Sequence, residues 1–178
     1  MVLRPARGQL ILPKPLVVDS STLFALGRVK LIKFLGKIDF KIFIPKAVKE
    51  EIQKGNDNLI LKLVKMTELK GRTLKISKQL EKLNLDKGES QCCALAFKLK
   101  LKFIICDDRR FIRQIFFSNN NKLKKIKILG FSFFLHEFYK NKLIDDVWKH
   151  FNEIIKVNNW ERSEVQVANY TFLKELGY

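Results

Sequence analysis

The sequence predicts an α/β fold: a central parallel sheet of four or five strands, flanked by helices and followed by a helical C-terminal segment. Short apolar runs that are typical of buried strands alternate with longer segments whose apolar residues recur at helical spacing. Such alternation is typical of a parallel sheet covered on both faces. With 178 residues, 47% of them hydrophobic, the chain can form a substantial core. We expect a single domain over residues 1–178, with a core at about 16–142 and a helical extension at about 143–178.

Two strand-and-helix units open the predicted domain. Leu16–Val18 is a short buried strand, and the Asp-Ser-Ser sequence after it suits the N-cap of a helix that covers Thr22–Leu35. Lys41–Ile44 is the second strand. Pro45 suits the first turn of the next helix, Lys46–Lys54.

The middle of the chain is expected to be mainly helical. Asn58–Leu69 has apolar residues on one side and lysines on the other, which predicts an amphipathic helix. Arg72–Ile76 is predicted to add a strand. Asp86-Lys87-Gly88-Glu89 is typical of a helix start, and that helix is expected to reach about Lys100.

The last strands of the sheet are predicted in the second half of the chain. Lys102–Cys106 is a β-rich run, and a helix is expected over Asp107–Ser118. Ile126–Leu129 is another short strand. The remainder is predicted to form two or three helices, with Ser163 as a cap.

The chain is strongly basic, with 35 Lys and Arg against 18 Asp and Glu, a net charge of +17 and a pI near 9.9. Such a field attracts polyanions such as nucleic acids. Seven basic residues and no acid occur between Arg109 and Lys127. The predicted nucleic-acid-binding residues are Arg109, Arg110, Arg113, Lys122, Lys124 and Lys125.

Five acids lie where a predicted strand gives way to a helix or in the first turns of helices. Ligands of parallel α/β folds bind beyond the carboxyl ends of the strands, so these side chains are expected to share one crevice. Clustered carboxylates repel one another unless a cation neutralises them, and Mg²⁺ and Mn²⁺ prefer oxygen ligands. The acids are Asp19, Glu51, Glu89, Asp107 and Asp108.

Each acid also has a structural interpretation. The role of Asp19 could be no more than that of a helix N-cap, and Asp107 or Asp108 could cap the helix that follows them. Asp86 and Glu89 have the spacing of a capping box. Glu50 and Glu51 could favour a helix dipole. The joint placement of these acids, however, favours a shared site.

Other residue patterns exclude several classes of protein. The three cysteines form no Cys-x-x-Cys pair and are expected to be small buried hydrophobes, which argues against a zinc site. Met1–Val18 is interrupted by prolines and basic residues, so we expect no secretory signal. No apolar run approaches the roughly 18 residues of a membrane span, and we expect a cytoplasmic protein.

Four segments resemble the motifs of the PIN-domain nucleases, which are small Rossmann-like proteins. Val17–Ser21 resembles the opening strand and first acid, and Ile44–Ile52 resembles the segment with the second acid, where Glu51 matches better than Glu50. Leu85–Ala96 resembles the helix of the third acid, Glu89. Ile105–Phe111 resembles the last strand and acid, with Asp108 the closest match and Asp107 adjacent.

The resemblance covers about Leu16–Lys142, and the tail is similar to one prokaryotic subgroup. The family includes the toxins of many prokaryotic toxin-antitoxin pairs. The resemblance implies endonucleolytic cleavage of RNA that depends on one or two Mg²⁺ or Mn²⁺ ions. It also implies a homodimer and a small antitoxin partner. The implied ligands of metal and water are Asp19, Glu51, Glu89 and Asp108, with Asp107 as a further metal ligand and Ser21, Glu50 and Asp86 as accessory residues.

Two departures from the family pattern stand out. Cys106 occupies a position where many relatives have a Thr or Ser hydroxyl, and the segment between Glu51 and Glu89 is long.

Three other functions compete with this one. An RNA-binding or ribosome-associated module with inactive acids would share the basic charge. A phosphatase with an aspartyl nucleophile is disfavoured because no second acid follows Asp19 two residues later. A dinucleotide-binding oxidoreductase is disfavoured because no Gly-x-Gly-x-x-Gly follows Val18.

Overall fold

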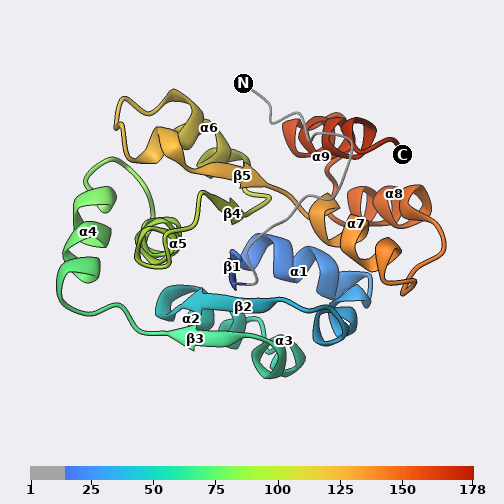
Figure 1. Ribbon diagram of the computed structural model, residues 1–178, viewed down its shortest axis with the longest axis horizontal. Coiled ribbons are helices and arrows are strands. Elements are labelled where there is room, and N and C mark those ends of the chain that lie inside the picture. The colour runs from blue at the N-terminus through green and yellow to red at the C-terminus, as the bar shows by residue number, and fades with distance from the viewer. Residues whose placement is uncertain (1–14) are drawn as a thin grey trace.

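The computed structural model describes residues 15–178, and its strands form one parallel sheet in two hydrogen-bonded parts. Expectations that fall on residues 1–14, including most of the segment in which we expected no secretory signal, lie outside the described residues. The strand order is β3-β2-β1-β4-β5, which Figure 1 shows from bottom to top. The expected parallel sheet of four or five strands is confirmed. The strands are β1 (Pro15–Val17), β2 (Lys41–Pro45), β3 (Lys65–Thr67), β4 (Phe103–Ile105) and β5 (Lys127–Leu129).

The two parts of the sheet meet directly after β1. Val18 forms a parallel bridge with Ile105 of β4. The amide of Val18 donates to the carbonyl of Phe43 at 3.3 Å, and the amide of Asp19 donates to the carbonyl of Ile105 at 2.9 Å. One short segment thus bonds to both neighbouring strands, and it ends at the first predicted acid.

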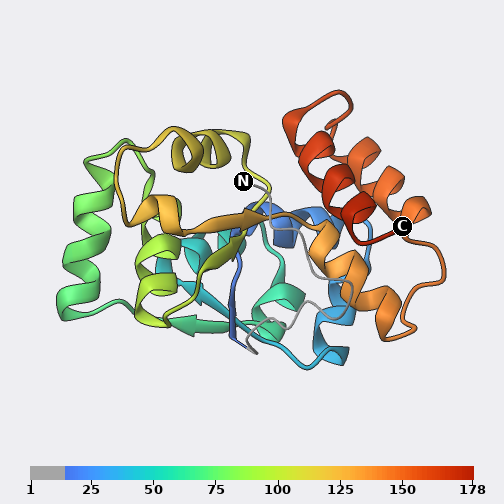
Figure 2. The same ribbon diagram turned by 45° about the horizontal axis from the view of Figure 1, so that its top comes forward.

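Helices connect the strands and extend the fold beyond the sheet. α5 packs against β1, β2 and β4, while α4 packs on α5. Figure 2 shows α7, α8 and α9 as a group beside the sheet, which confirms the expected helical C-terminal segment. The helices are α1 (Ser20–Arg28), η1 (Leu31–Lys37), α2 (Lys46–Lys54), α3 (Asn58–Leu63), α4 (Gly71–Glu81), α5 (Lys87–Lys98), α6 (Arg109–Phe117), η2 (Leu123–Lys125), α7 (Ser132–Lys140), α8 (Val147–Val157) and α9 (Glu164–Glu175).

The predictions for the middle of the chain were partly wrong. The expected helix over Asn58–Leu69 ends at Leu63, and Lys65–Thr67 forms β3 instead. β3 is a largely exposed edge strand with little apolar signal, and it exists because it pairs with β2. The expected strand at Arg72–Ile76 belongs to α4, whose buried residues Ser77 and Leu80 lie on one side of the helix.

The first long helix was also predicted incorrectly. Helix α1 ends at Arg28, and Lys30 adopts a left-handed conformation with a φ of 60°. The chain then continues as the 3₁₀ segment Leu31–Lys37. The apolar spacing of Thr22–Leu35 therefore reflects two helical pieces that bury residues in the same core, not one continuous helix.

A buried carboxylate ties the C-terminal helices to the sheet edge. Asp107 Oδ2 accepts from Thr22 Oγ1 at 2.7 Å and from the amide of Phe131 at 2.9 Å, and Asp107 Oδ1 accepts from Asn169 Nδ2 at 2.8 Å. The other amide atom, Asn169 Oδ1, accepts from the amide of Ser132 at 2.9 Å. Helices α1, α7 and α9 thus converge on the residue that follows β4 by two positions.

In the part of the chain that the structure describes, no helix combines the length and the apolar composition needed to cross a bilayer.

We predict that Gly130→Ala destabilises the protein by about 1–3 kcal/mol, the usual cost of forcing extra atoms into a packed site. A Cβ at Gly130 would lie 2.3 Å from Asn169 Oδ1 and 2.5 Å from Asp107 Oδ1, so this buried network would have to open. Denaturant unfolding measures the loss. Gly36→Ala is the matched control, because a Cβ there meets only the tip of Leu63 at 3.1 Å. Equal stability of the two variants would contradict the prediction.

Candidate active site

Asp19 lies directly after the first strand and is nearly buried, with 7% of its surface exposed. It is the N-cap of α1: Asp19 Oδ2 accepts from the amide of Ser21 at 3.2 Å and from Ser21 Oγ at 2.9 Å. Burial raises the pKa of the Asp19 carboxyl, although these hydrogen bonds act in the opposite direction. The cap interpretation is therefore correct, and Ser21 orients the carboxylate.

Two cysteine thiols also contact the Asp19 carboxylate. Cys106 Sγ lies 3.5 Å from Oδ2, and Cys92 Sγ lies 3.9 Å from Oδ1. Burial raises the pKa of both thiols well above the usual value, so each stays protonated and can donate. The prediction that the cysteines are buried is confirmed. Their contact with Asp19 was missed, although the Thr or Ser of relatives at position 106 was a signal for it.

Glu51 reaches the same sheet edge from the second turn of α2; the expectation that Glu50 and Glu51 lie in the first turn was wrong, because the helix begins at Lys46. Ser20 Oγ donates to Glu51 Oε2 at 2.5 Å, which joins the residue after Asp19 to this acid. Glu51 Oε1 faces the first turn of α5, since a Cβ at Gly88 would lie 2.8 Å from it. Burial raises the pKa of Glu51, and the nearby charges of Asp19 and Asp86 raise it further.

Glu89 lies in the first turn of α5 and is 4% exposed. It forms the expected capping box with Asp86: Glu89 Oε2 accepts from the Asp86 amide at 2.7 Å, and Asp86 Oδ1 accepts from the Glu89 amide at 2.8 Å. The second oxygen, Oε1, is buried and has no hydrogen-bond partner among the described residues. Burial raises the pKa of this carboxyl as well.

Arg110 brings a positive charge to these acids from α6. Its Nη2 lies 3.1 Å from Asp86 Oδ2 and 3.4 Å from Glu89 Oε2. The charge of Glu89 is the main cause of the raised pKa of Arg110, and the charges of Asp86 and Asp108 contribute too. Arg110 therefore links α6 electrostatically to the start of α5.

The two aspartates after β4 have different surroundings. Both oxygens of Asp107 are engaged by Thr22, Asn169 and the amide of Phe131, and burial raises the Asp107 pKa to about 6. Asp108 is less buried, and its Oδ1 caps α6 by accepting from the Phe111 amide at 3.0 Å. The sequence contained no local signal for the role of Asn169, which is distant along the chain.

Glu50, predicted as an accessory residue, points to basic side chains. Its carboxylate lies 3.9 Å from Lys46 Nζ and 3.4 Å from Lys87 Nζ.

The predicted nucleic-acid-binding residues are exposed. Arg109, Arg110 and Arg113 belong to α6, and Arg113 also pairs with Glu164 of α9. The predicted lysines, Lys122, Lys124 and Lys125, lie after α6, in and around η2. Within residues 15–178 none of these three has an ion-pair partner.

No three His, Cys, Asp or Glu side chains among the described residues lie close enough together to hold a metal ion. Two observations nevertheless fit a hard divalent cation. The carboxyls of Asp19, Glu51 and Glu89 have raised pKa values, and a cation would favour their ionised forms. In addition, Glu89 Oε1 has no hydrogen-bond partner among residues 15–178. Modest movement of these side chains towards a bound ion would be needed.

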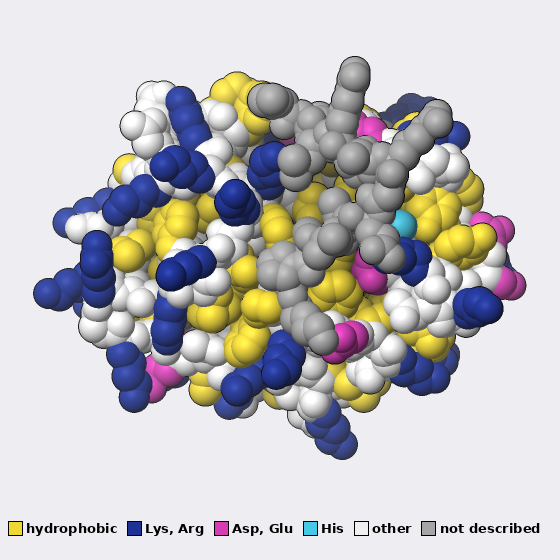
Figure 3. Space-filling model, viewed as in Figure 1, with side chains coloured by type: hydrophobic (Ala, Val, Ile, Leu, Met, Phe, Trp, Pro, Cys, Tyr) yellow, Lys and Arg dark blue, Asp and Glu magenta, His cyan; other side chains and the backbone are white. Residues whose placement is uncertain are grey.

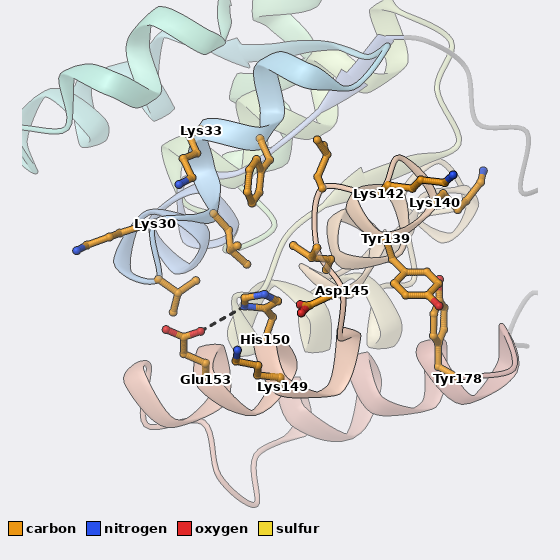
Figure 4. Close-up of a pocket in the computed structure, with 15 residues that line it drawn as sticks. Lys30, Lys33, Tyr139, Lys140, Lys142, Asp145, Lys149, His150, Glu153 and Tyr178 are labelled. Atoms are coloured by element: carbon orange, nitrogen blue, oxygen red, sulfur yellow. Dashed lines mark hydrogen bonds and ion pairs between the residues drawn. The ribbon is translucent and has the colours of Figure 1, made fainter.

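A separate cavity of about 1030 Å³ lies at the other end of α1 (Figure 4). Lysines from η1, α7 and α8 line it, and His150 Nδ1 lies 3.3 Å from Glu153 Oε2 at its side. None of the predicted acids lines this cavity, so it is not part of the acidic site.

A family model described as a PIN domain matches residues 15–174, so the chain belongs to the PIN-domain family. PIN domains are generally nucleases, and they typically use divalent metal ions. No curated protein matches the chain.

We predict that Cys106→Ser keeps or raises activity, whereas Cys106→Val lowers it. Serine can donate a shorter, stronger hydrogen bond to Asp19 Oδ2 than the thiol does at 3.5 Å, whereas valine fills the buried position with a somewhat larger side chain that has no donor. Initial cleavage rates at saturating metal measure the effect, with thermal unfolding as a control for folding. Equal rates for the two variants would exclude a role for this hydrogen bond.

We also predict that Mn²⁺ or Mg²⁺ stabilises the folded protein at neutral pH, by about 2.7 kcal/mol at a hundred times the dissociation constant. Because the carboxyls of Asp19, Glu51 and Glu89 have raised pKa values, the metal-free protein loses stability as the pH rises from the usual acidic range towards those values. The cation favours the ionised forms, so its stabilising effect grows with pH. Thermal unfolding with and without metal tests this.

The variants Asp19→Asn and Glu89→Gln are expected to lose this metal response. Glu68→Gln is the matched control, because Glu68 is exposed and pairs only with Lys70 in the described structure. A metal response that survives in Asp19→Asn would exclude these acids as the binding site.

Proposed function

We propose that the protein is a divalent-metal-dependent endoribonuclease whose site lies at the carboxyl edge of the sheet. The observation that carries this proposal is the group of largely buried carboxylates with raised pKa values that come from three elements: Asp19 after β1, Glu51 on α2 and Glu89 on α5. If each acid served only its own helix, there would be no reason for acids from three elements to lie at one edge of the sheet. Membership of the PIN-domain family and the net charge of +17 support it.

In this proposal Asp19, Glu89 and Asp108 hold one or two Mg²⁺ or Mn²⁺ ions. Such a cation supplies positive charge for the phosphate and makes water more acidic. Ser21 and Cys106 keep the Asp19 carboxylate oriented, since both contact Oδ2.

Glu51 is proposed to accept the proton of the attacking water at Oε1, because Ser20 already occupies Oε2. A glutamate carboxylate held in place by a hydrogen bond to its other oxygen is suited to act as a general base. Asp107, in contrast, is proposed to support the site without binding metal, since three donors engage its two oxygens.

Arg110 is proposed to hold substrate phosphate beside the acids. Its guanidinium lies next to Glu89 and Asp86 and is largely exposed, with 59% of the side chain accessible. A cation bound by the carboxylates would weaken their hold on Arg110 and leave its donors for phosphate.

The toxin-type assignment, with a homodimer, a small antitoxin partner and a cytoplasmic location, stays a prediction from the family resemblance. A partner that silences the enzyme would have to cover the edge at which Asp19 and Glu89 lie.

We predict that the purified protein cleaves labelled RNA only when Mn²⁺ or Mg²⁺ is present. Glu51→Gln is expected to lower the rate by about 10²–10⁴-fold, the usual contribution of a general base. Asp19→Asn and Glu89→Gln should abolish cleavage, and Glu68→Gln should cleave like the wild type. A single-stranded DNA of the same sequence, assayed in parallel, tests the choice of RNA.

RNA binding without cleavage, in the wild type and in Asp19→Asn alike, would contradict the nuclease proposal. That outcome would favour an RNA-binding module, in which Arg110 permanently neutralises Glu89 and Asp86 in place of a metal.

A further inference from the structure

Helix α6 carries its arginines and two phenylalanines on one solvent-facing side. The helix starts immediately after Asp108, and positions 109, 113, 116 and 117 follow the spacing i, i+4, i+7 and i+8. Position 110 lies beside 113 and 117 on the same side. The residues of this side, here called the α6 face, are Arg109, Arg110, Arg113, Phe116 and Phe117, and all of them are exposed.

The opposite side of α6 is anchored in the core. Phe111 is fully buried and Ile115 is 6% exposed, so the rotation of the helix is fixed. The α6 face is therefore held outward by the packing of the same helix.

The exposure of the two phenylalanines has no structural benefit. Phe116 is 73% exposed and Phe117 is 75% exposed, whereas the other exposed large hydrophobic side chains of the described chain range from 36% to 61%. Their rings touch edge to face with centroids 5.0 Å apart, at the end of the helix away from Asp108. Adjacent aromatic rings held in water are typical of a binding surface.

The charge around these rings identifies the chemistry of the partner. From Arg109 to Lys127 there are seven basic residues and no acid. Figure 3 shows many dark blue side chains on the left of the view, over α4, α6 and the segment that leads to β5. Cations at the start of one helix face, followed by exposed aromatic rings at its end, match a strand that offers phosphates and unstacked bases together.

We propose that the α6 face binds single-stranded RNA, with Arg109 and Arg110 on phosphates and Phe116 and Phe117 stacked on unpaired bases; Arg113 is held by Glu164 instead. A duplex keeps its bases stacked inside, so this surface selects single strands. Phe117 lies about 14 Å along the helix from Asp108, given a rise of 1.5 Å per residue. The bound bases would therefore flank a phosphate held at Arg110. This inference rests on the proposed function only in assigning that phosphate to the cleavage site.

Binding is best tested without metal, so that cleavage plays no part. The probe is fluorescently labelled oligouridylate in EDTA, measured by fluorescence anisotropy, against the same strand annealed to oligoadenylate. Phe116→Ala and Phe117→Ala should each weaken single-strand binding by roughly tenfold, as expected for the loss of one stacked base. Duplex binding should change little. Val167→Ala, which removes an exposed apolar side chain from α9, should bind like the wild type.

Two further measurements separate stacking from other roles of the rings. Phe116→Tyr should retain binding because the ring remains, while Phe116→Leu should not. The logarithm of the binding constant falls linearly with the logarithm of the salt concentration. The magnitude of this slope should be unchanged in Phe116→Ala but should decrease by about 0.7 in Arg109→Ala, the value for one phosphate contact to a single strand.

Unchanged single-strand affinity in both Phe→Ala variants would overturn the proposal, and so would an equal loss of duplex affinity. A lower molecular mass in solution for the double variant, with RNA binding intact, would instead identify the α6 face as a contact between two copies of the chain. Failure of the nuclease proposal is distinguishable: Asp19→Asn and wild type would bind alike through the phenylalanines, and neither would cleave with Mn²⁺.

Discussion

The backbone segment that joins the two parts of the sheet determines where the site forms. Val18 bonds to β2 and Asp19 bonds to β4, so the first acid emerges between two strands that run in the same direction. The carboxyl ends of parallel strands lie at one edge of a sheet. Ser20, which follows Asp19, and Cys106, which follows β4, lie at that same edge. A shift of this register by one residue would turn Asp19 to the other face of the sheet.

Burial destabilises the ionised forms of these carboxylates, and the positive charge of the protein surface does not offset that cost. Despite a net charge of +17, the described cation that reaches Glu89 and Asp86 is Arg110, and the pKa values of Asp19, Glu51 and Glu89 remain raised. A group of acids kept in this state is typical of a functional site, because structure alone would favour neutral residues there. The other basic residues on α6 and in the segment that follows it are exposed.

The C-terminal helices help to position the residues at this edge of the sheet. Asp107 follows Cys106, which contacts Asp19, and it is fixed by donors from α1, from the start of α7 and from Asn169 on α9. Packing of α7 and α9 therefore sets the direction in which the chain leaves β4. That direction in turn decides which of the two adjacent aspartates remains available at the edge.

The sequence by itself determined the parallel α/β fold, because apolar runs that alternate with amphipathic helices have few other ways to be buried. It also determined the helix caps Asp19 and Asp108 and the capping box of α5, since these are local patterns. Only the tertiary structure decided that β3 forms at Lys65–Thr67, that Asn169 holds Asp107, and that Cys92 contacts Asp19. Each of these depends on partners distant along the chain, and the local sequence carries no record of which partner the folded backbone will bring within hydrogen-bonding distance.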